Sequence, residues 1–202
     1  MRRPGLIVGV VAVAVIAYVS YNSLSTEGPG ARGVAEGREL PPFAVPLALS
    51  DLEGDANVSE RACRVRGPDV LNVCELAERG PVVLAFFAEP AERCDEEIDL
   101  LDRIRTRHPD VQFAAVAIRG DRDDLRRRVR HRGWELPVGH DRDGAVANAY
   151  AVAVCPTITF AARGGEIRST AFGSQTEREL DAAIAALSRP APSPSATAEG
   201  PG

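Results

Sequence analysis

The chain has 202 residues, of which 45% are hydrophobic and 26% are charged, a composition usual for a globular protein. Its formal net charge of -5 argues against a nucleic-acid-binding protein, because such proteins bind phosphates through a basic surface. We therefore expect one folded domain with extensions, and no nucleic-acid partner.

The first 22 residues carry a candidate membrane anchor. Arg2 and Arg3 precede an apolar run from Gly5 to Val19, which is somewhat shorter than a typical membrane-spanning helix. No small-x-small cleavage site follows the run, so we favour an uncleaved transmembrane anchor over a cleaved signal peptide. Since positive residues stay in the cytoplasm, we expect a single-pass protein of the cell membrane with a cytoplasmic N-terminus and an extracytoplasmic domain.

Two further segments are too poor in apolar residues to form a core. Residues 23–41 are rich in Gly, Ser, Glu and Ala, and are predicted to form a flexible linker. Residues 189–202 form a Pro/Ser/Ala-rich tail that we expect to be disordered. The folded domain is therefore expected to span residues 42–188, a normal size for one domain.

Two of the four cysteines lie near the start of this domain. Cys63 and Cys74 flank a segment that contains the turn sequence GPD at residues 67–69, which indicates a turn between short strands. Disulfides persist in an exported protein, so we expect the two cysteines to face each other across a β-hairpin as a structural disulfide. Closing so short a loop would stabilise the fold by about 3 kcal/mol on the chain-entropy model.

The next elements alternate between strand and helix. Apolar runs typical of buried strands occupy residues 82–87 and 111–118, and helical patterns follow them at residues 92–108 and 121–133. This order predicts parallel strands joined by right-handed crossovers. We interpret the arginine-rich face of the second helix as a solvated surface rather than an anion-binding site.

The last part of the domain continues the pattern. A short strand is predicted at residues 136–141 and a short helix at residues 143–152. Residues 157–173 contain two alternating runs separated by a pair of glycines, which indicates a β-hairpin. An amphipathic helix follows at residues 176–189, and Thr176 is its predicted N-cap.

The order of these elements resembles the thioredoxin superfamily, in particular its membrane-anchored, extracytoplasmic TlpA-type and redoxin-like proteins. The resemblance rests on VVLAFFA before a helix and VAVCPTITFAARGGEI after it, and covers nearly all of residues 42–188. It implies an α/β, thioredoxin-like fold with a central mixed sheet flanked by helices, here with an N-terminal β-hairpin extension. It also implies that Pro156, followed by Thr157, is the cis-proline beside the substrate groove.

The same comparison places a degenerate active site at residues 91–94. In the family's CxxC motif the first cysteine is the exposed nucleophile, and the second resolves the mixed disulfide. Here AERC stands in place of CxxC, so Ala91 occupies the position of the nucleophile and Cys94 that of the resolving cysteine. The family's buried acid would fall at Ala85, and the acidic neighbours of Cys94 oppose a thiolate. Ordinary CxxC exchange is therefore not expected.

The resemblance suggests one intramolecular partner for Cys94. It places the loop of Pro156 against the start of the helix that carries Cys94, and Cys155 directly precedes Pro156. A bond between Cys94 and Cys155 would be either a permanent staple or a displaced redox pair, and the alternative is two buried thiols.

Functions of different classes remain open. One is a membrane-anchored, atypical thiol-disulfide oxidoreductase of cell redox homeostasis, in which Cys94 and Cys155 exchange electrons with an exported protein thiol. Another is a non-catalytic module that binds a peptide beside Pro156 for recognition or assembly. A peroxiredoxin-like antioxidant is a minor alternative, because the Thr of that family's Thr-x-x-Cys signature is replaced by Ala91. We expect no cofactor, and no metal site, since no histidine has a second ligand at helical spacing.

Overall fold

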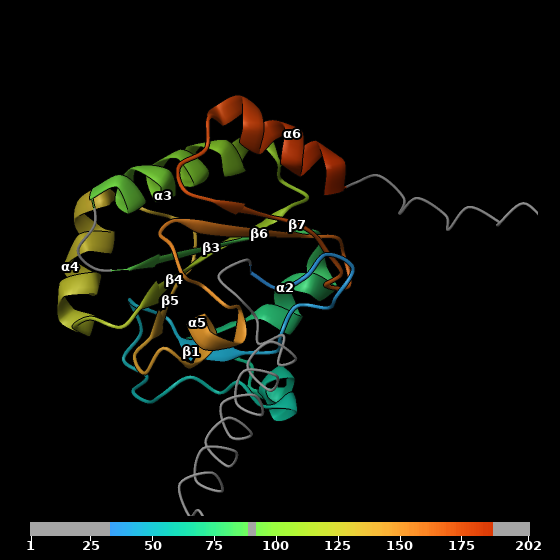
Figure 1. The fold of residues 1–202 in the computed structure, drawn as a ribbon. Helices are drawn as coiled ribbons and strands as arrows, with labels where there is room; N and C mark the ends of the chain where they lie inside the picture. Colours follow the sequence, from blue (N-terminus) through green and yellow to red (C-terminus); the bar gives the residue numbers. More distant parts are fainter. Residues whose placement is uncertain (1–32, 89–91, 188–202) are drawn as a thin grey trace, which may run out of the picture. The chain divides into compact units, whose positions relative to one another are not determined.

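The computed structural model describes residues 33–88 and 92–187 and contains a mixed sheet with helices on both faces (Figure 1). Five strands lie in the order β5-β4-β3-β6-β7; β3, β4 and β5 are parallel, β6 is antiparallel to β3, and β7 is antiparallel to β6. The strands are β3 (Val82–Ala88), β4 (Gln112–Ile118), β5 (Val138–Asp141), β6 (Thr157–Ala161) and β7 (Ile167–Phe172). The predicted fold class is thus confirmed.

The central strand β3 is buried on both faces. Val83, Ala85 and Phe87 belong to one apolar core, whereas the alternate residues, among them Leu84 and Phe86, belong to the other. Because helices cover both sides of the sheet, the strand has a continuous apolar sequence instead of an alternating one. This is why its position could be predicted from composition alone.

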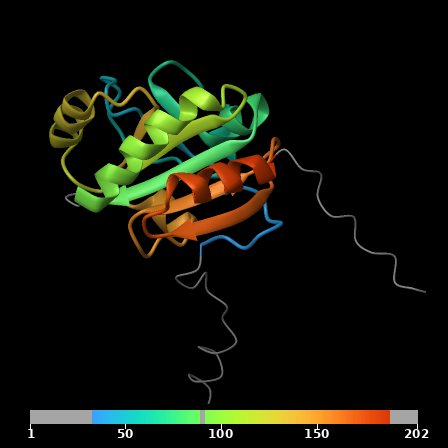
Figure 2. The ribbon, with the colours of Figure 1, turned by 90° about the horizontal axis from the view of Figure 1, so that it is seen from above.

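Three helices cover the first face of the sheet. They are α3 (Glu92–Ile104), which continues into the short η2 (Arg105–Arg107), α4 (Arg122–Arg132) and α6 (Glu177–Leu187). Helices α3 and α6 lie side by side above the strands in Figure 2, and both contribute aliphatic residues such as Ile98 and Leu180 to the core. Helix α4 contributes Leu125 and Val129 to the same core.

The opposite face is covered by shorter elements. They are β1 (Ala44–Pro46), η1 (Glu60–Arg64), β2 (Val70–Asn72), α2 (Val73–Arg79) and α5 (Ala145–Ala149). The Tyr150 ring packs 5.8 Å from that of Phe43 and 4.8 Å from that of Phe86. Its hydroxyl donates a 2.9 Å hydrogen bond to the carbonyl of Pro41, so the one polar group of this buried ring is satisfied.

Two local predictions near the C-terminal end are confirmed. The Thr176 N–H donates to Glu179 Oε2 at 2.7 Å and the Glu179 N–H donates to Thr176 Oγ1 at 3.3 Å, which is the reciprocal pattern of a capping box. Gly164 and Gly165, with φ of +91° and +98°, form the turn between β6 and β7. Only glycine adopts two such angles in succession without strain.

The folded part of the chain begins before the predicted boundary at residue 42, which corrects the predicted linker of residues 23–41. Glu39 forms an antiparallel bridge with Glu166, and the N–H of Gly37 donates to the carbonyl of Ile167 at 2.8 Å. The side chain of Leu40 is buried. Backbone hydrogen bonds to the start of β7 hold this segment in place, and the amino-acid composition of the segment does not indicate such pairing.

The predicted anchor of residues 1–22, most of the linker and the tail of residues 189–202 lie outside the described residues. Within residues 33–88 and 92–187, every helix is too short or too polar to cross a membrane.

The N-terminal hairpin extension is present, but its strands are not those expected. β2 pairs with β1, in the register Ala44 with Asn72, and neither strand contains a cysteine. Cys63 lies in η1 and Cys74 in α2, so the two cysteines do not face each other across a hairpin. The Asn72 side chain caps α2, a helix that we did not predict, by accepting hydrogen bonds from the N–H groups of Cys74 and Glu75.

Candidate functional site

Cys94 and Cys155 are joined by a disulfide at one end of the sheet. Their Cα atoms are 5.9 Å apart, although 61 positions separate them in the sequence. Cys94 lies in the first turn of α3, which follows the carboxyl end of β3, and Cys155 lies just before β6. Because β6 runs antiparallel to β3, the end of one strand and the beginning of the other meet at the same edge. The topology therefore brings the two cysteines together.

The two sulfurs of this bond have different surroundings. Cys94 is only 2% exposed and belongs to the core under α3. Cys155 is partly exposed, and the preceding Val154 is 45% exposed. The backbone N–H of Ala88 donates a 3.3 Å hydrogen bond to Sγ of Cys155. The disulfide is therefore less buried on the side of Cys155 than on the side of Cys94.

The loop that carries Cys155 is held on both sides. The Cys155–Pro156 peptide bond is cis, as the family resemblance implied. The buried Thr157 donates through its hydroxyl to the carbonyl of Val154 at 2.7 Å, and the N–H of Gly173 donates to the carbonyl of Pro156 at 2.8 Å. The first contact closes the loop on itself, and the second fixes it to the residue that follows β7. Ala91, at the predicted position of the missing nucleophile, lies outside the described residues.

Glu97 is a buried acidic residue of the helix that carries Cys94, and its burial is not predicted from the sequence. It follows Cys94 by three residues on α3, so both side chains lie on the same face of the helix. The side chain is 3% exposed; Oε2 accepts a 3.1 Å hydrogen bond from the N–H of Gln175, whereas Oε1 has no hydrogen-bond partner in the described chain. Burial raises the pKa of the Glu97 carboxyl, and the bond from Gln175 opposes that shift in part.

A signal for Glu97 was present in the sequence. The expected apolar positions of the helix include Cys94, Ile98 and Leu101, and residue 97 lies within that stripe. The family's acid corresponds to Ala85, which is a fully buried residue of β3. The protein thus lacks an acid at that strand position but has one on the helix.

The negative charge of Asp95, next to Cys94, is offset by α4. Asp95 is 6% exposed and lies 3.4 Å from the guanidinium groups of both Arg128 and Arg132. Burial raises the pKa of the Asp95 carboxyl, while the two arginines oppose that shift. The predicted opposition between Asp95 and a thiolate on Cys94 is therefore weaker than its sequence position indicated.

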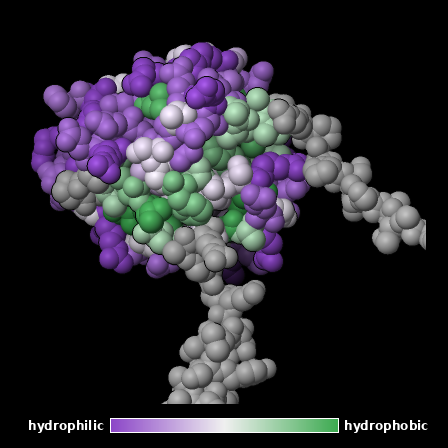
Figure 3. Space-filling model, turned by 45° about the horizontal axis from the view of Figure 1, so that its top comes forward, coloured by the Kyte–Doolittle hydropathy of each residue, from purple (hydrophilic) through white to green (hydrophobic). Residues whose placement is uncertain are grey.

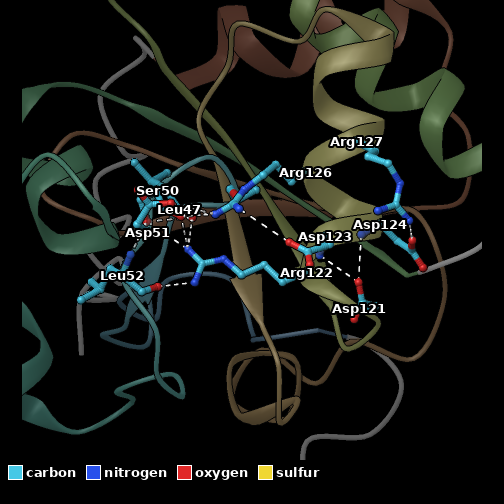
Figure 4. Close-up of polar contacts among 11 residues, drawn as sticks. Leu47, Ser50, Asp51, Leu52, Asp121, Arg122, Asp123, Asp124, Arg126 and Arg127 are labelled. Carbon is cyan, nitrogen blue, oxygen red and sulfur yellow. Dashed lines mark hydrogen bonds and ion pairs between the residues drawn. The ribbon is translucent and has the colours of Figure 1, made fainter.

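Other arginines of α4 bind the loop that follows β1, which corrects the interpretation of this helix as a solvated face (Figure 4). Arg122 donates to the carbonyls of Leu47 at 2.7 Å and Ser50 at 2.8 Å, and also to that of Leu52. Arg126 donates to the carbonyl of Ser50 at 2.6 Å. Two arginines of the helix therefore organise backbone and do not form an anion site.

The second disulfide joins Cys63 and Cys74, with a Cα–Cα distance of 5.4 Å. It is supported by the buried Asn72, whose side-chain amide donates to the carbonyls of Ala62 at 2.9 Å and Val65 at 2.7 Å. Asn72 thus holds η1 against α2 beside the disulfide. The predicted pair is present, but it joins two helical segments.

With the cis-proline loop packed against the start of α3, the domain has a thioredoxin-like fold, as the sequence predicted. The fold is shared with a Chlorobium tepidum protein assigned as a thiol:disulfide interchange protein DsbE, with a TM-score of 0.63, 18% identity, and coverage of 76% of this chain and 98% of that one. A secreted Mycobacterium tuberculosis disulfide oxidoreductase homologous to Escherichia coli DsbE gives a TM-score of 0.53 at 23% identity, covering 59% and 90% of the two chains.

Among curated proteins, the chain is similar to the thiol-disulfide oxidoreductase ResA of Geobacillus kaustophilus. The two are 24% identical over 173 residues, which cover 85% of this chain and 87% of the relative. Comparison with models of protein families gave no match. The chain therefore has a thioredoxin-like fold, and thiol-disulfide oxidoreductases are among the proteins to which it is similar.

Proposed function

We propose that the protein is an atypical thiol-disulfide oxidoreductase, held at the extracytoplasmic side of the cell membrane by residues 1–22. Its redox couple is Cys94–Cys155, which exchanges two electrons with a thiol pair of another exported protein. The observation that carries this proposal is that one residue of the bond, Cys155, is partly exposed directly before the cis-proline. The oxidoreductase relatives and a secreted structural neighbour support it.

The reaction needs no cysteine at position 91. A substrate dithiol gives up two electrons and two protons and becomes a disulfide, while Cys94–Cys155 accepts them and becomes two thiols. The reverse reaction would reduce a substrate disulfide. A couple formed by distant cysteines satisfies the same electron balance as a CxxC pair.

A redox titration of the full chain tests this proposal. The protein is equilibrated in glutathione and dithiothreitol buffers of graded potential, free thiols are alkylated, and mass spectrometry maps them. We expect Cys94–Cys155 to be reduced at about −200 mV, as catalytic couples are. Cys63–Cys74 should stay bonded until the buffer potential falls below about −300 mV. A Cys94–Cys155 bond that resists reduction to the same potential as the structural bond would contradict the proposal.

That contrary result would favour the second candidate, a non-catalytic module for recognition or assembly. The observation in its favour is that Cys94 is 2% exposed, as expected of a cysteine in a permanent staple. In this case the exposed Val154 would contact a bound peptide without any exchange of thiols. The same burial of Cys94 gives a peroxidase mechanism no support, because a peroxide would have to reach that sulfur.

A further inference from the structure

The two sulfurs of the Cys94–Cys155 bond are not equivalent targets for a thiolate. We propose that an incoming substrate thiolate attacks Sγ of Cys155, and that Cys94 is the leaving thiolate. This order is the reverse of that in a CxxC motif, where the cysteine at the start of the helix forms the mixed disulfide. The inference rests on the proposed function, and it specifies the residue that becomes covalently bound to the substrate.

Access distinguishes the two sulfurs. Thiol-disulfide exchange depends on which sulfur the attacking thiolate can reach. Cys94 is 2% exposed and packs in the core with Ile98 and Leu101, so a protein substrate cannot approach its sulfur without opening α3. Cys155 is partly exposed, and both residues before it, Ala153 and Val154, are exposed. A substrate can therefore approach Cys155 along an open stretch of loop.

Hydrogen bonding also favours Cys155 as the exchanging residue. Its Sγ accepts the hydrogen bond from the N–H of Ala88, and a donor of this kind stabilises a thiolate on the same atom. Cys155 would thus be nucleophilic after reduction, as attack on a substrate disulfide in the reverse direction requires.

Cys94 has the surroundings of a leaving thiolate. It lies in the first turn of α3, where the positive end of the helix dipole stabilises an anion. The neighbouring Asp95 is paired with Arg128 and Arg132, so its charge acts less strongly on Cys94. The sulfur that accepts the electron pair is therefore the one at the helix start.

A substrate thiolate forms a bond to Sγ of Cys155, the Cys155–Cys94 bond breaks, and its electron pair goes to Sγ of Cys94, which then takes a proton from solvent. A second thiolate of the substrate attacks the substrate sulfur of the mixed disulfide. This releases Cys155 as a thiolate and leaves the substrate oxidised by two electrons.

Two matched variants of the full chain test this order. Cys94→Ser leaves only Cys155 as a free thiol, and Cys155→Ser leaves only Cys94, with Cys63–Cys74 bonded in both. The probe is Ellman's reagent, a small disulfide whose exchange releases a coloured thiolate. We expect Cys94→Ser to react at least about tenfold faster than Cys155→Ser. Equal rates, or a faster Cys155→Ser variant, would overturn the proposal.

A measurement on the unaltered chain decides the matter if either variant fails to fold. The oxidised protein is incubated with glutathione, quenched with acid and digested with trypsin, which cuts after arginine. Cys94 and Cys155 then lie on separate peptides, residues 94–103 and 143–163. We expect the glutathione adduct on the second peptide, and an adduct on the first would overturn the order. The redox titration remains a separate test, since a couple with the opposite order would still be reduced near the same potential.

Discussion

Glu97 of α3 accepts a hydrogen bond from the backbone N–H of Gln175, which lies 78 positions further along the chain, just before α6. The bond connects the helix of the candidate site to the C-terminal helix. It satisfies only one of the two carboxylate oxygens, because Oε1 has no hydrogen-bond partner among residues 33–88 and 92–187. A buried carboxylate with an unsatisfied oxygen makes the charged form unfavourable in the folded protein.

The substitution Glu97→Gln is expected to stabilise the fold at neutral pH. Since the folded-state pKa of Glu97 is raised, protonation stabilises the fold fully below the ordinary pKa of 4.5, and this contribution is lost as pH rises through the folded pKa. The variant should therefore unfold at higher urea concentration than the parent at pH 7, and the difference should shrink by pH 3.5. Glu96→Gln, at an exposed position of the same helix, is the control. A larger gain in stability for Glu97→Gln at pH 3.5 than at pH 7 would contradict the raised pKa of Glu97.

Asn72→Ala is expected to destabilise the fold by about 2 to 3 kcal/mol, because it removes a helix N-cap and leaves the buried carbonyl of Ala62 and the carbonyl of Val65 without their donor. Urea unfolding with the Cys63–Cys74 bond intact measures the change. The control is Ser59→Ala, since the exposed Ser59 caps η1 with a single bond to the N–H of Arg61. If both variants lost the same stability, Asn72 would have no role beyond capping.

Arg122→Ala is expected to destabilise the fold by about 2 kcal/mol, since a hydrogen bond from a charged donor contributes about 1.5 to 3 kcal/mol to the stability of a protein. Its guanidinium binds backbone carbonyls on both sides of Ser50 (Figure 4). Arg127→Ala is the matched control, because Arg127 is exposed on the same helix and pairs with the exposed Asp124. Proteolysis of the residue 47–52 loop should increase only in the first variant, and unchanged protection would count against the role of Arg122.

Phe172→Ser is expected to slow exchange with apolar substrates, because the exposed ring lies near the cis-proline. Phe172 is 39% exposed and pairs in register with Thr157, the residue that follows the cis-proline. Figure 3 shows one face of the domain, on which hydrophobic residues reach the surface among hydrophilic ones. Two dithiol peptides, with leucine or serine beside the first cysteine, are compared by quenched alkylation. The leucine peptide should reduce Cys94–Cys155 about tenfold more slowly in the variant, a loss of about 1.4 kcal/mol.

The control for this prediction is Val65→Ser, because Val65 is 40% exposed in the loop after η1. It should leave the rates of both peptides unchanged. An equal slowing of the leucine and serine peptides by Phe172→Ser would show that the ring supports the loop and does not select substrates.

The sequence predicted the part of the fold where local pattern and tertiary structure agree. β3 and β4 are continuous apolar runs, and α6 carries its capping box, so each could be located within one or two residues. The region around Asn72 was misinterpreted because GPD indicated a hairpin, whereas the pairing partner of β2 lies 24 to 28 residues earlier, in β1. No local pattern reports a partner at that distance.

The candidate site divides in the same way. The proximity of Cys94 to Cys155 and Pro156 could be predicted because the family resemblance supplies their relative positions. The environment of Asp95 could not, since it depends on Arg128 and Arg132 from a helix 33 to 37 residues away. The acidic residues around Cys94 in the sequence indicated an unfavourable position for a thiolate, whereas in the fold the two arginines offset the charge of Asp95.

The short segment that pairs with β7 also affects how the isolated domain would behave in solution. β7 is the last strand of the sheet, and the carbonyl of Arg38 accepts a 2.8 Å hydrogen bond from the N–H of Ile167 while Leu40 covers the neighbouring core. A chain shortened to start at residue 42 would present unpaired backbone groups at this edge. Such an edge is a template for sheet formation between molecules, and residues 37–40 cover it at the start of β7.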